Sequence, residues 1–243
     1  MTNPTAAMLV IGDEILSGRT RDANMYHLAG EMTKLGIDLK EVRVVSDDAS
    51  AIIEAVNALR GRYDSVFTSG GIGPTHDDIT ADCVAAAFGA HIDVREDARA
   101  ILAESYARRG IEMNEARLRM ARIPDGATLI DNPVSAAPGF TMENVHVMAG
   151  VPSIFQAMVA SVAPLLSGGA PLISATVRVT LPEGDVAGPL AKIAADAPSV
   201  SIGSYPFNNA EGMGSNVVIR GSDAALVEEV AQSLKLAFAG FVG

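Results

Sequence analysis

Short apolar runs along the chain alternate with longer stretches in which apolar residues recur every three or four positions. Such short runs are typical of buried strands, and the longer pattern is typical of helices with one buried face. The pattern predicts three successive strand–helix units, with strands at residues 6–11, 39–45 and 64–68 and helices at residues 22–35, 50–59 and 81–88. Consecutive units of this kind form a parallel sheet with helices on both faces, so the expected fold class is α/β.

The pattern is less regular between residues 91 and 166. It predicts a connector at residues 91–94, helices at 95–109, 114–121 and 154–166, a strand at 127–130, and a hairpin of strands 140–142 and 145–148. A glycine–proline turn at residues 149–153 opens the last of these helices. Free N–H groups behind such a turn favour an anion, which makes the turn a second candidate anion site.

The turn-rich segment 167–171 predicts a domain boundary, because glycine and proline are the strongest interruptions of regular structure. We expect one domain at residues 1–168 and a smaller one at residues 171–243. The second has the order strand, helix, strand, strand, helix, at residues 175–181, 187–195, 200–205, 216–220 and 223–238. This order predicts a small α+β domain that is KH-like. An RNA-binding role is not expected, since the stretch has few lysines and arginines and no GxxG loop with basic flanks.

The chain is acidic, with a formal net charge of −11 and an isoelectric point near 4.7. This balance argues against nucleic acid as a partner, because affinity for nucleic acid comes largely from lysine and arginine contacts to phosphates. It leaves room for a small phosphorylated ligand, which needs only local N–H groups, one or two arginines and a metal ion.

Hydrophobic residues make up 49% of the 243 residues, enough for a proper core. No apolar run reaches the length of a membrane span and no signal segment opens the chain, so no membrane partner is expected. Cys83 is the one cysteine, which excludes an internal disulfide and favours a reduced, cytoplasmic location. We expect Cys83 to fill a buried space.

The most informative stretch leaves a predicted strand and opens a predicted helix; it reads Ser69-Gly70-Gly71-Ile72-Gly73-Pro74-Thr75-His76-Asp77-Asp78-Ile79-Thr80. Its three glycines let the backbone turn sharply and let an anion approach closely. The free N–H groups at the start of the helix favour a phosphate. The adjacent carboxylates of Asp77 and Asp78 would repel that phosphate unless a divalent cation such as Mg²⁺ lay between them. The alternative is a plain turn in which Asp77 or Asp78 caps the helix.

Carboxylates also follow the other two predicted strands. Asp13 and Glu14 follow the first strand, and Asp47 follows the second. The carboxyl ends of parallel strands share one edge of the sheet, where ligands bind. We therefore expect a divalent metal ion to be bound there by Asp13, Asp47 and Asp78. Alternatively, Asp47 is a helix cap, and Asp13 and Glu14 belong to a solvated turn.

The loop at residues 69–80 closely resembles the signature of the molybdopterin-binding (MoaB/Mog-type) domain family, and the similarity extends over nearly all of residues 6–166. It is most similar to the branch that holds the N-terminal domain of CinA-type proteins and the matching domain of FAD synthase. CinA-type proteins also have a small appended domain. The resemblance implies a three-layer α/β fold, a homo-oligomer, and a ligand that carries a pterin or nucleotide phosphate.

The resemblance implies that Asp47 and Asp78 are catalytic, in contact with the reactive end of the ligand or with its metal ion. It implies ligand or phosphate contacts at a larger set of positions: Gly70, Gly71, Gly73, Thr75, Asn114, Arg119, Asn132, Pro138, Gly139, Gly150, Pro152 and Ser153. The hydroxyls of Thr75 and Thr80 could donate to a phosphate, or they could cap the helix. The alternative for Pro138-Gly139 is a plain turn.

Two functions follow from the resemblance. One is divalent-metal-dependent hydrolysis of a nucleotide pyrophosphate such as ADP-ribose or FAD, in which the metal ion acidifies an attacking water and glycine amides stabilise the developing charge. The other is a protein of molybdenum cofactor biosynthesis that binds or transfers molybdopterin, as its ligand, without hydrolysis. A degenerate domain kept only for assembly is disfavoured by the intact acidic loops.

Overall fold

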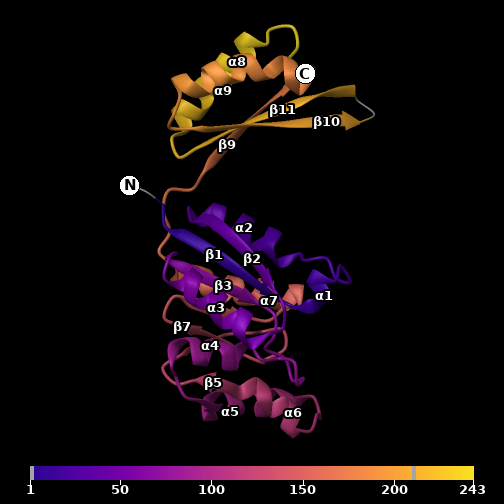
Figure 1. Cartoon of the computed structure of the whole chain (residues 1–243), viewed down its shortest axis with the longest axis vertical. Coiled ribbons are helices and arrows are strands. Elements are labelled where there is room, and N and C mark those ends of the chain that lie inside the picture. Colours follow the sequence, from indigo (N-terminus) through magenta and orange to yellow (C-terminus); the bar gives the residue numbers. More distant parts are fainter. Residues whose placement is uncertain (1–2, 210–211) are drawn as a thin grey trace. The chain divides into compact units, whose positions relative to one another are not determined.

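The computed structural model of the chain describes residues 3–209 and 212–243. The chain divides into two compact units, Met1–Gly169 and Ala170–Gly243, each with its own hydrophobic core (Figure 1). Within the described residues, no helix is both long and apolar enough to cross a lipid bilayer.

The first unit is built on a mixed six-stranded sheet in the order β2-β1-β3-β8-β7-β6. Its strands are β1 (Thr5–Ile11), β2 (Asp38–Val45), β3 (Ser65–Ser69), β6 (Thr128–Ile130), β7 (Gly139–Met142) and β8 (Val145–Met148). The strands β2, β1, β3 and β8 run parallel, and β7 is antiparallel to both of its neighbours. The four parallel strands therefore end at the same edge of the sheet.

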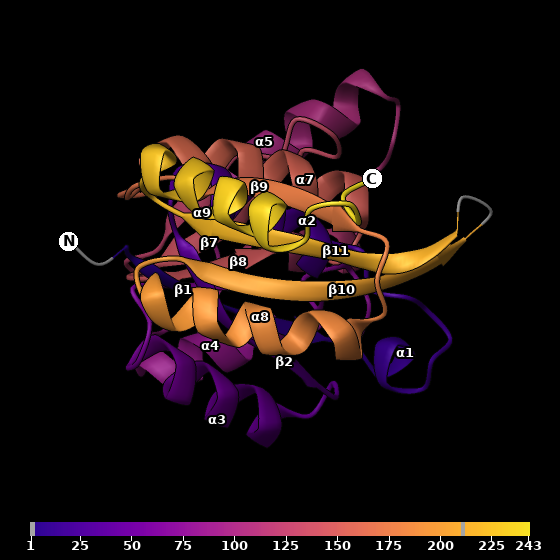
Figure 2. The same cartoon turned by 90° about the horizontal axis from the view of Figure 1, so that it is seen from above.

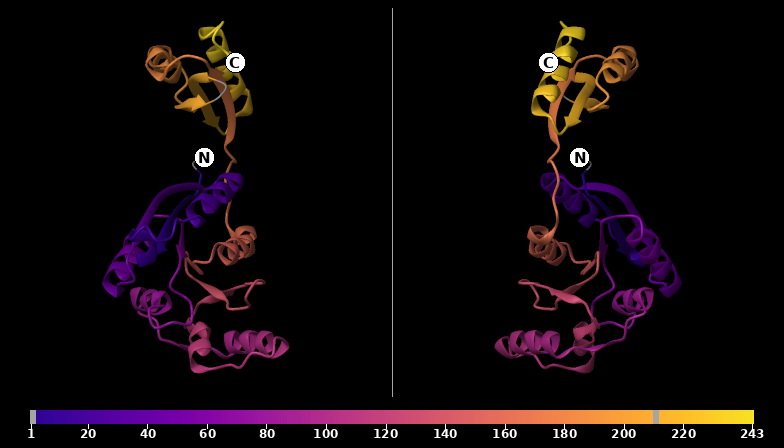
Figure 3. Two further views of the ribbon diagram at one scale, coloured as in Figure 1. Left: turned by 90° about the vertical axis from the view of Figure 1, so that its right-hand side faces the viewer. Right: turned by 90° about the vertical axis from the view of Figure 1, so that its left-hand side faces the viewer.

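Helices cover both faces of this sheet, as Figure 3 shows. The two sides hold α2 (Asn24–Leu35) with α7 (Pro152–Val162), and α3 (Ala49–Arg60) with α4 (Thr80–Phe88). The central strand β1 serves both sides, because its side chains alternate between them. Ala6, Met8 and Val10 pack with α2 and α7, and Ala7, Leu9 and Ile11 pack with α3 and α4. This confirms the expected α/β architecture, and it explains why β1 is a continuous apolar run.

Three short elements differ from the sequence prediction. The predicted connector at residues 91–94 forms β4 (Ile92–Val94), which pairs antiparallel with β5 (Arg122–Pro124). The predicted helix at 114–121 is a single turn, α6 (Glu115–Leu118), followed by a 3₁₀ turn, η1 (Arg119–Ala121). The loop after β1 contains the one-turn helix α1 (Asp13–Leu16). Elements of three or four residues are too short to show a periodicity in the sequence.

The remaining elements of the first unit are α5 (Glu96–Arg108) and the 3₁₀ turn η2 (Ala163–Leu165). Cys83 is only 3% exposed on α4, and burial raises the pKa of its thiol to about 11. The prediction that this cysteine fills a buried space is confirmed.

The second unit has the order β9 (Ile173–Val179), α8 (Glu183–Asp196), β10 (Ser201–Asn209), β11 (Gly212–Gly221) and α9 (Ala224–Ala237). Its strands form an antiparallel sheet in the order β10-β11-β9, and both helices pack on one face of it (Figure 2). The helix α8 begins four residues earlier than predicted. Glu183 and Asp185 lie in its first turn, where negative charge is favourable.

Candidate functional site

A cleft of about 630 Å³ lies at the carboxyl ends of the parallel strands of the first unit. Residues one or two positions after the ends of these strands line it, namely Gly12 after β1, Asp47 after β2, Gly70 after β3 and Gly150 after β8. Ligand pockets in proteins typically have volumes of roughly 300–1,000 Å³, so the cleft has room for a nucleotide-sized molecule. Its position agrees with the general rule for parallel sheets.

The glycine turn after β3 forms one wall of the cleft. Gly70 and Gly71 have φ of +109° and +68°, a region that favours glycine. A Cβ at Gly70 would lie 2.2 Å from the carbonyl oxygen of Ile11. Among the described residues, no acceptor receives the main-chain N–H groups of Gly71, Ile72 and Gly73. All three residues line the cleft, so the turn supplies three unpaired donors suited to an anion.

Asp47 lines the cleft and does not cap the following helix. Its neighbour Asp48 is the cap of α3, with a carboxylate oxygen that accepts a hydrogen bond from the N–H of Ala51 at 2.9 Å. The Oδ2 atom of Asp47 accepts instead from the main-chain N–H of Asp13 at 2.9 Å. The capping alternative for Asp47 is therefore wrong, and its carboxylate is fixed beside the cleft.

Asp78 also lines the cleft, and its carboxylate is hydrogen-bonded to another residue of the same loop. Its Oδ2 atom accepts hydrogen bonds from the N–H of Thr75 at 2.8 Å and from the hydroxyl of Thr75 at 2.5 Å. Among the described residues, no side chain caps α4, whose N-cap residue is Ile79. The hydroxyl of Thr75, predicted as a phosphate contact, is thus engaged by Asp78. The side chain of His76 in the same loop is fully exposed and does not line the cleft.

The cleft carries an excess of negative charge. Burial raises the pKa of the Asp47 carboxyl, and the charges of Asp13, Glu14 and Asp77 raise it further, while the N–H of Asp13 has the opposite effect. In the part of the chain that the structure describes, no three histidine, cysteine, aspartate or glutamate side chains lie close enough together to hold a metal ion. The expected set of Asp13, Asp47 and Asp78 is therefore not brought together as a complete site. Asp13 contributes its N–H to Asp47, and its side chain does not line the cleft.

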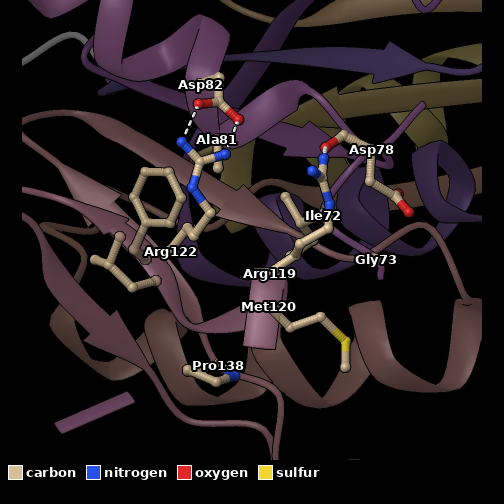
Figure 4. Close-up of a pocket in the computed structure, with 11 residues that line it drawn as sticks. Ile72, Gly73, Asp78, Ala81, Asp82, Arg119, Met120, Arg122 and Pro138 are labelled. Carbon is tan, nitrogen blue, oxygen red and sulfur yellow. Dashed lines mark hydrogen bonds and ion pairs between the residues drawn. The ribbon is translucent and has the colours of Figure 1, made fainter. Parts of the chain in front are cut away.

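A small pocket of about 20 Å³ adjoins the cleft and shares Asp78 with it (Figure 4). Arg122 in this pocket forms a bidentate ion pair with Asp82, at 2.6 and 2.7 Å. The guanidinium of Arg119 donates only to the carbonyl oxygen of Asp78, at 3.3 Å, and pairs with no carboxylate among the described residues. Arg119 therefore places an uncompensated positive charge beside the acidic loop.

The structure places some of the other predicted ligand positions at the cleft or the small pocket and others at neither. Those that line the cleft are Gly70, Gly71, Gly73, Asn132, Gly150 and Pro152, and those that line the small pocket are Gly73, Arg119 and Pro138. The remaining positions, Thr75, Asn114, Gly139 and Ser153, line neither the cleft nor the small pocket. Asn114 caps α6 by accepting from the N–H of Arg117 at 2.9 Å. A Cβ at Gly139 would lie 2.3 Å from the carbonyl oxygen of Val147, and Ser153 lies exposed in the first turn of α7.

Asn24 is a site residue that the sequence reasoning missed. It is 3% exposed, and its Nδ2 atom donates to Ser69 Oγ and to the carbonyl oxygen of Gly150, both at 2.8 Å. It thereby ties the turn after β3 to the turn after β8. The signal was present in the sequence, because Asn24, Leu28 and Met32 share one face of α2 and all are buried. A polar residue in phase with a buried face indicates a specific partner.

Replacing Asn24 with alanine is expected to lower the free energy of unfolding by about 2 kcal/mol, because two buried hydrogen bonds are lost and the carbonyl of Gly150 is left without its partner. Urea denaturation measures the change. Asn57→Ala is the matched control, since Asn57 is an exposed helical asparagine whose side chain accepts a hydrogen bond only from Arg60 in the described part of the chain. Equal costs for the two substitutions would contradict the proposed tie between the turns.

Comparisons with known proteins agree with this architecture. A family model described as a probable molybdopterin binding domain matches residues 7–168, and one described as the middle domain of FAD synthase matches residues 171–242. A protein of Pyrobaculum calidifontis is 37% identical over 212 residues, covering 84% of this chain and 81% of that protein. A probable FAD synthase of Caenorhabditis elegans is 32% identical over 263 aligned residues, covering 98% of this chain and 50% of that protein. This chain thus matches only half the length of that relative.

A solved structure of the protein CinA from Thermoplasma acidophilum aligns with 68% of this chain and 98% of its own chain, at 32% identity and a TM-score of 0.61. That similarity shows that the first unit has a CinA-like fold. The chain belongs to the family described as probable molybdopterin-binding domains, and its second unit is like the middle domain of FAD synthase.

Proposed function

We propose that the cleft binds a nucleotide or pterin phosphate, and that the chain hydrolyses a nucleotide pyrophosphate such as ADP-ribose or FAD with the help of a divalent metal ion. The observation that carries this proposal is the presence, in one cleft, of the unpaired N–H groups of Gly71–Gly73 and the carboxylates of Asp47 and Asp78. The N–H groups attract an anion and the carboxylates repel it. An anion that binds together with a divalent cation is accepted by both sets of groups, because the cation lies between the anion and the carboxylates.

The residues fit a hard cation such as Mg²⁺, because carboxylate oxygens are its preferred protein ligands. Mg²⁺ is usually held by one or two carboxylates together with substrate phosphates, so a preformed group of three protein ligands is not required. Asp47 and Asp78 would hold the ion. When bound, it would supply positive charge to the phosphoryl oxygens and acidify an attacking water.

Groups of the chain itself would bind the phosphate and the organic part of the ligand. The N–H groups of Gly71, Ile72 and Gly73 would bind the phosphate and stabilise the charge that develops on it. Arg119 would approach the ligand from the adjoining pocket, since its charge has no carboxylate partner there among the described residues. The apolar side chains of Ile11, Met120 and Ile154 line the same cleft and would contact the organic part of the ligand.

Incubation of the purified chain with ADP-ribose and with FAD, each with Mg²⁺ or Co²⁺, tests the proposal. We expect AMP as a product, and we expect none when the metal ion is removed by a chelator. Absence of AMP from both substrates would reject hydrolysis.

The second candidate function is binding or transfer of molybdopterin without hydrolysis. It is supported by the family match over residues 7–168, which is described as a probable molybdopterin binding domain. Tight binding of molybdopterin together with absence of AMP would establish this function in place of the first.

The raised pKa of Asp47 predicts a pH dependence. The folded metal-free protein holds the proton of Asp47 to a higher pH than an ordinary aspartate, whose pKa is 3.8. A divalent cation competes with that proton, so Mg²⁺ affinity is expected to fall on acidification at a pH above 3.8. Calorimetric titration of Mg²⁺ at several pH values measures the fall, and Asp47→Asn should remove it. A midpoint at or below 3.8 would contradict the prediction.

A further inference from the structure

Thr80, the first residue of α4, is hydrogen-bonded to two carbonyl groups of the glycine turn. Its side chain is fully buried. Its hydroxyl donates to the carbonyl oxygen of Gly70 at 3.0 Å, and its main-chain N–H donates to the carbonyl oxygen of Gly71 at 2.9 Å. The hydroxyl therefore neither caps the helix nor reaches a ligand in the cleft, which were the two interpretations that the sequence left open.

These two bonds fix the direction of two peptide groups. In a trans peptide the C=O and the following N–H point in opposite directions. The carbonyls of Gly70 and Gly71 both point at Thr80, so the N–H groups of Gly71 and Ile72 point away from it. These are two of the three unpaired donors described above, and both residues line the cleft.

The turn needs such an anchor because glycine imposes no direction of its own. Gly70 and Gly71 both have positive φ, and glycine populates positive and negative φ about equally well. Without bonds to the two carbonyls, the peptides of this turn would be free to rotate, and their N–H groups would lose a common direction. Gly71 also packs tightly against the threonine, since a Cβ at this position would clash with the hydroxyl oxygen of Thr80.

We propose that Thr80 is a positioning residue, which holds the glycine turn in the orientation that presents the N–H groups of Gly71 and Ile72 to a phosphate. This inference rests on the proposed function, because it takes the cleft to be an anion site. Thr80 itself does not touch the ligand.

Thr80→Val tests the inference, because it keeps the shape of the side chain and removes the hydroxyl. Thr80→Ala removes the hydroxyl without a branched side chain, so the result does not depend on the folding of one variant. Thr80→Ser returns the hydroxyl. Thr68→Val is the matched control, since Thr68 is also fully buried and its hydroxyl has no partner among the described residues.

The probe is inorganic pyrophosphate with Mg²⁺, added to the full chain. Calorimetry gives the dissociation constant, and amide NMR shifts of Gly71 and Ile72 report contact with the turn. We expect Thr80→Val and Thr80→Ala to weaken binding about five- to tenfold, which corresponds to one hydrogen bond, and to abolish the ligand-induced shift of the Gly71 amide. The Ile72 amide should keep its shift, because its peptide is still held by the main-chain N–H of Thr80. Thr80→Ser and Thr68→Val should bind like the wild type. A purely structural role would lower the unfolding midpoint and leave the dissociation constant of the folded protein unchanged.

The outcomes separate this inference from the proposed function. If the wild type binds pyrophosphate with shifts at Gly71 and Ile72 and the two hydroxyl-free variants bind it equally well, the role of Thr80 is rejected and the anion site stands. If the wild type binds no pyrophosphate, or binds it without shifts at the turn, the role of Thr80 and the proposed anion site are both rejected.

Discussion

Replacing Asp47 with asparagine is expected to reduce metal-dependent release of AMP about a hundredfold or more, because a neutral amide is a far weaker ligand for a divalent cation than a carboxylate. The same change is expected to raise the free energy of unfolding at neutral pH. The pKa of Asp47 is raised in the folded protein by burial and by neighbouring carboxylates, so its ionised form opposes folding above the unfolded-state pKa. That cost is absent at low pH and appears as pH rises through the raised pKa.

The Asp47→Asn substitution removes the charge of the side chain and keeps its shape. The side-chain oxygen of an asparagine can still accept the N–H of Asp13, so the link between the two loops is kept. Asp48→Asn is the matched control, because the neighbouring residue caps α3 and asparagine caps a helix as well as aspartate does. Turnover and thermal unfolding of the two variants are compared at one pH. Loss of activity in both variants, or lower stability in Asp47→Asn, would contradict the assignment.

Replacing Gly70 with alanine is expected to cost about 3 kcal/mol or more of the free energy of unfolding. Two effects add. The φ of +109° is unfavourable for any residue with a Cβ, and that Cβ would lie 2.2 Å from the carbonyl oxygen of Ile11. The obstacle is main chain from the end of β1, which cannot move aside as a flexible side chain would. Relief would require β1 and β3 to separate where their loops form the cleft.

Gly89→Ala separates the two effects. Gly89 ends α4 with a φ of +64°, and a Cβ there would meet no atom of the described residues within 4 Å. Only the backbone term applies, so we expect a cost of about 1 kcal/mol. Urea unfolding of both variants gives the difference. Equal costs would show that the contact between Gly70 and Ile11 is not rigid.

The repeated strand–helix units could be predicted from the sequence because each is long enough to show its period. The continuous apolar run of β1 and the apolar stripe of α2 match their burial in the structure. The glycine loop could be predicted for another reason, since a strand, three glycines and a helix start leave few arrangements of the backbone. Its two left-handed residues are Gly70 and Gly71.

The finer parts of the site could not be predicted, because they depend on which of two similar neighbours takes a local role. Asp47 and Asp48 are equivalent in sequence, and only the register of α3 decides which one becomes its cap. The burial of Asn24 could be predicted from its helix face, but its partners could not, because Ser69 and Gly150 lie 45 and 126 residues away along the chain. Asp13 was expected as a ligand, but a one-turn helix directs its N–H to Asp47.

The division into two units with separate cores has a consequence for calorimetry. A scan of the whole chain is not expected to follow a single cooperative endotherm, because each core can melt at its own temperature. The chain has no tryptophan, but its tyrosines divide between the units, with Tyr26, Tyr63 and Tyr106 in the first and Tyr205 in the second. Tyr205→Phe would therefore make the tyrosine signal in the near ultraviolet report on the cleft-bearing unit alone.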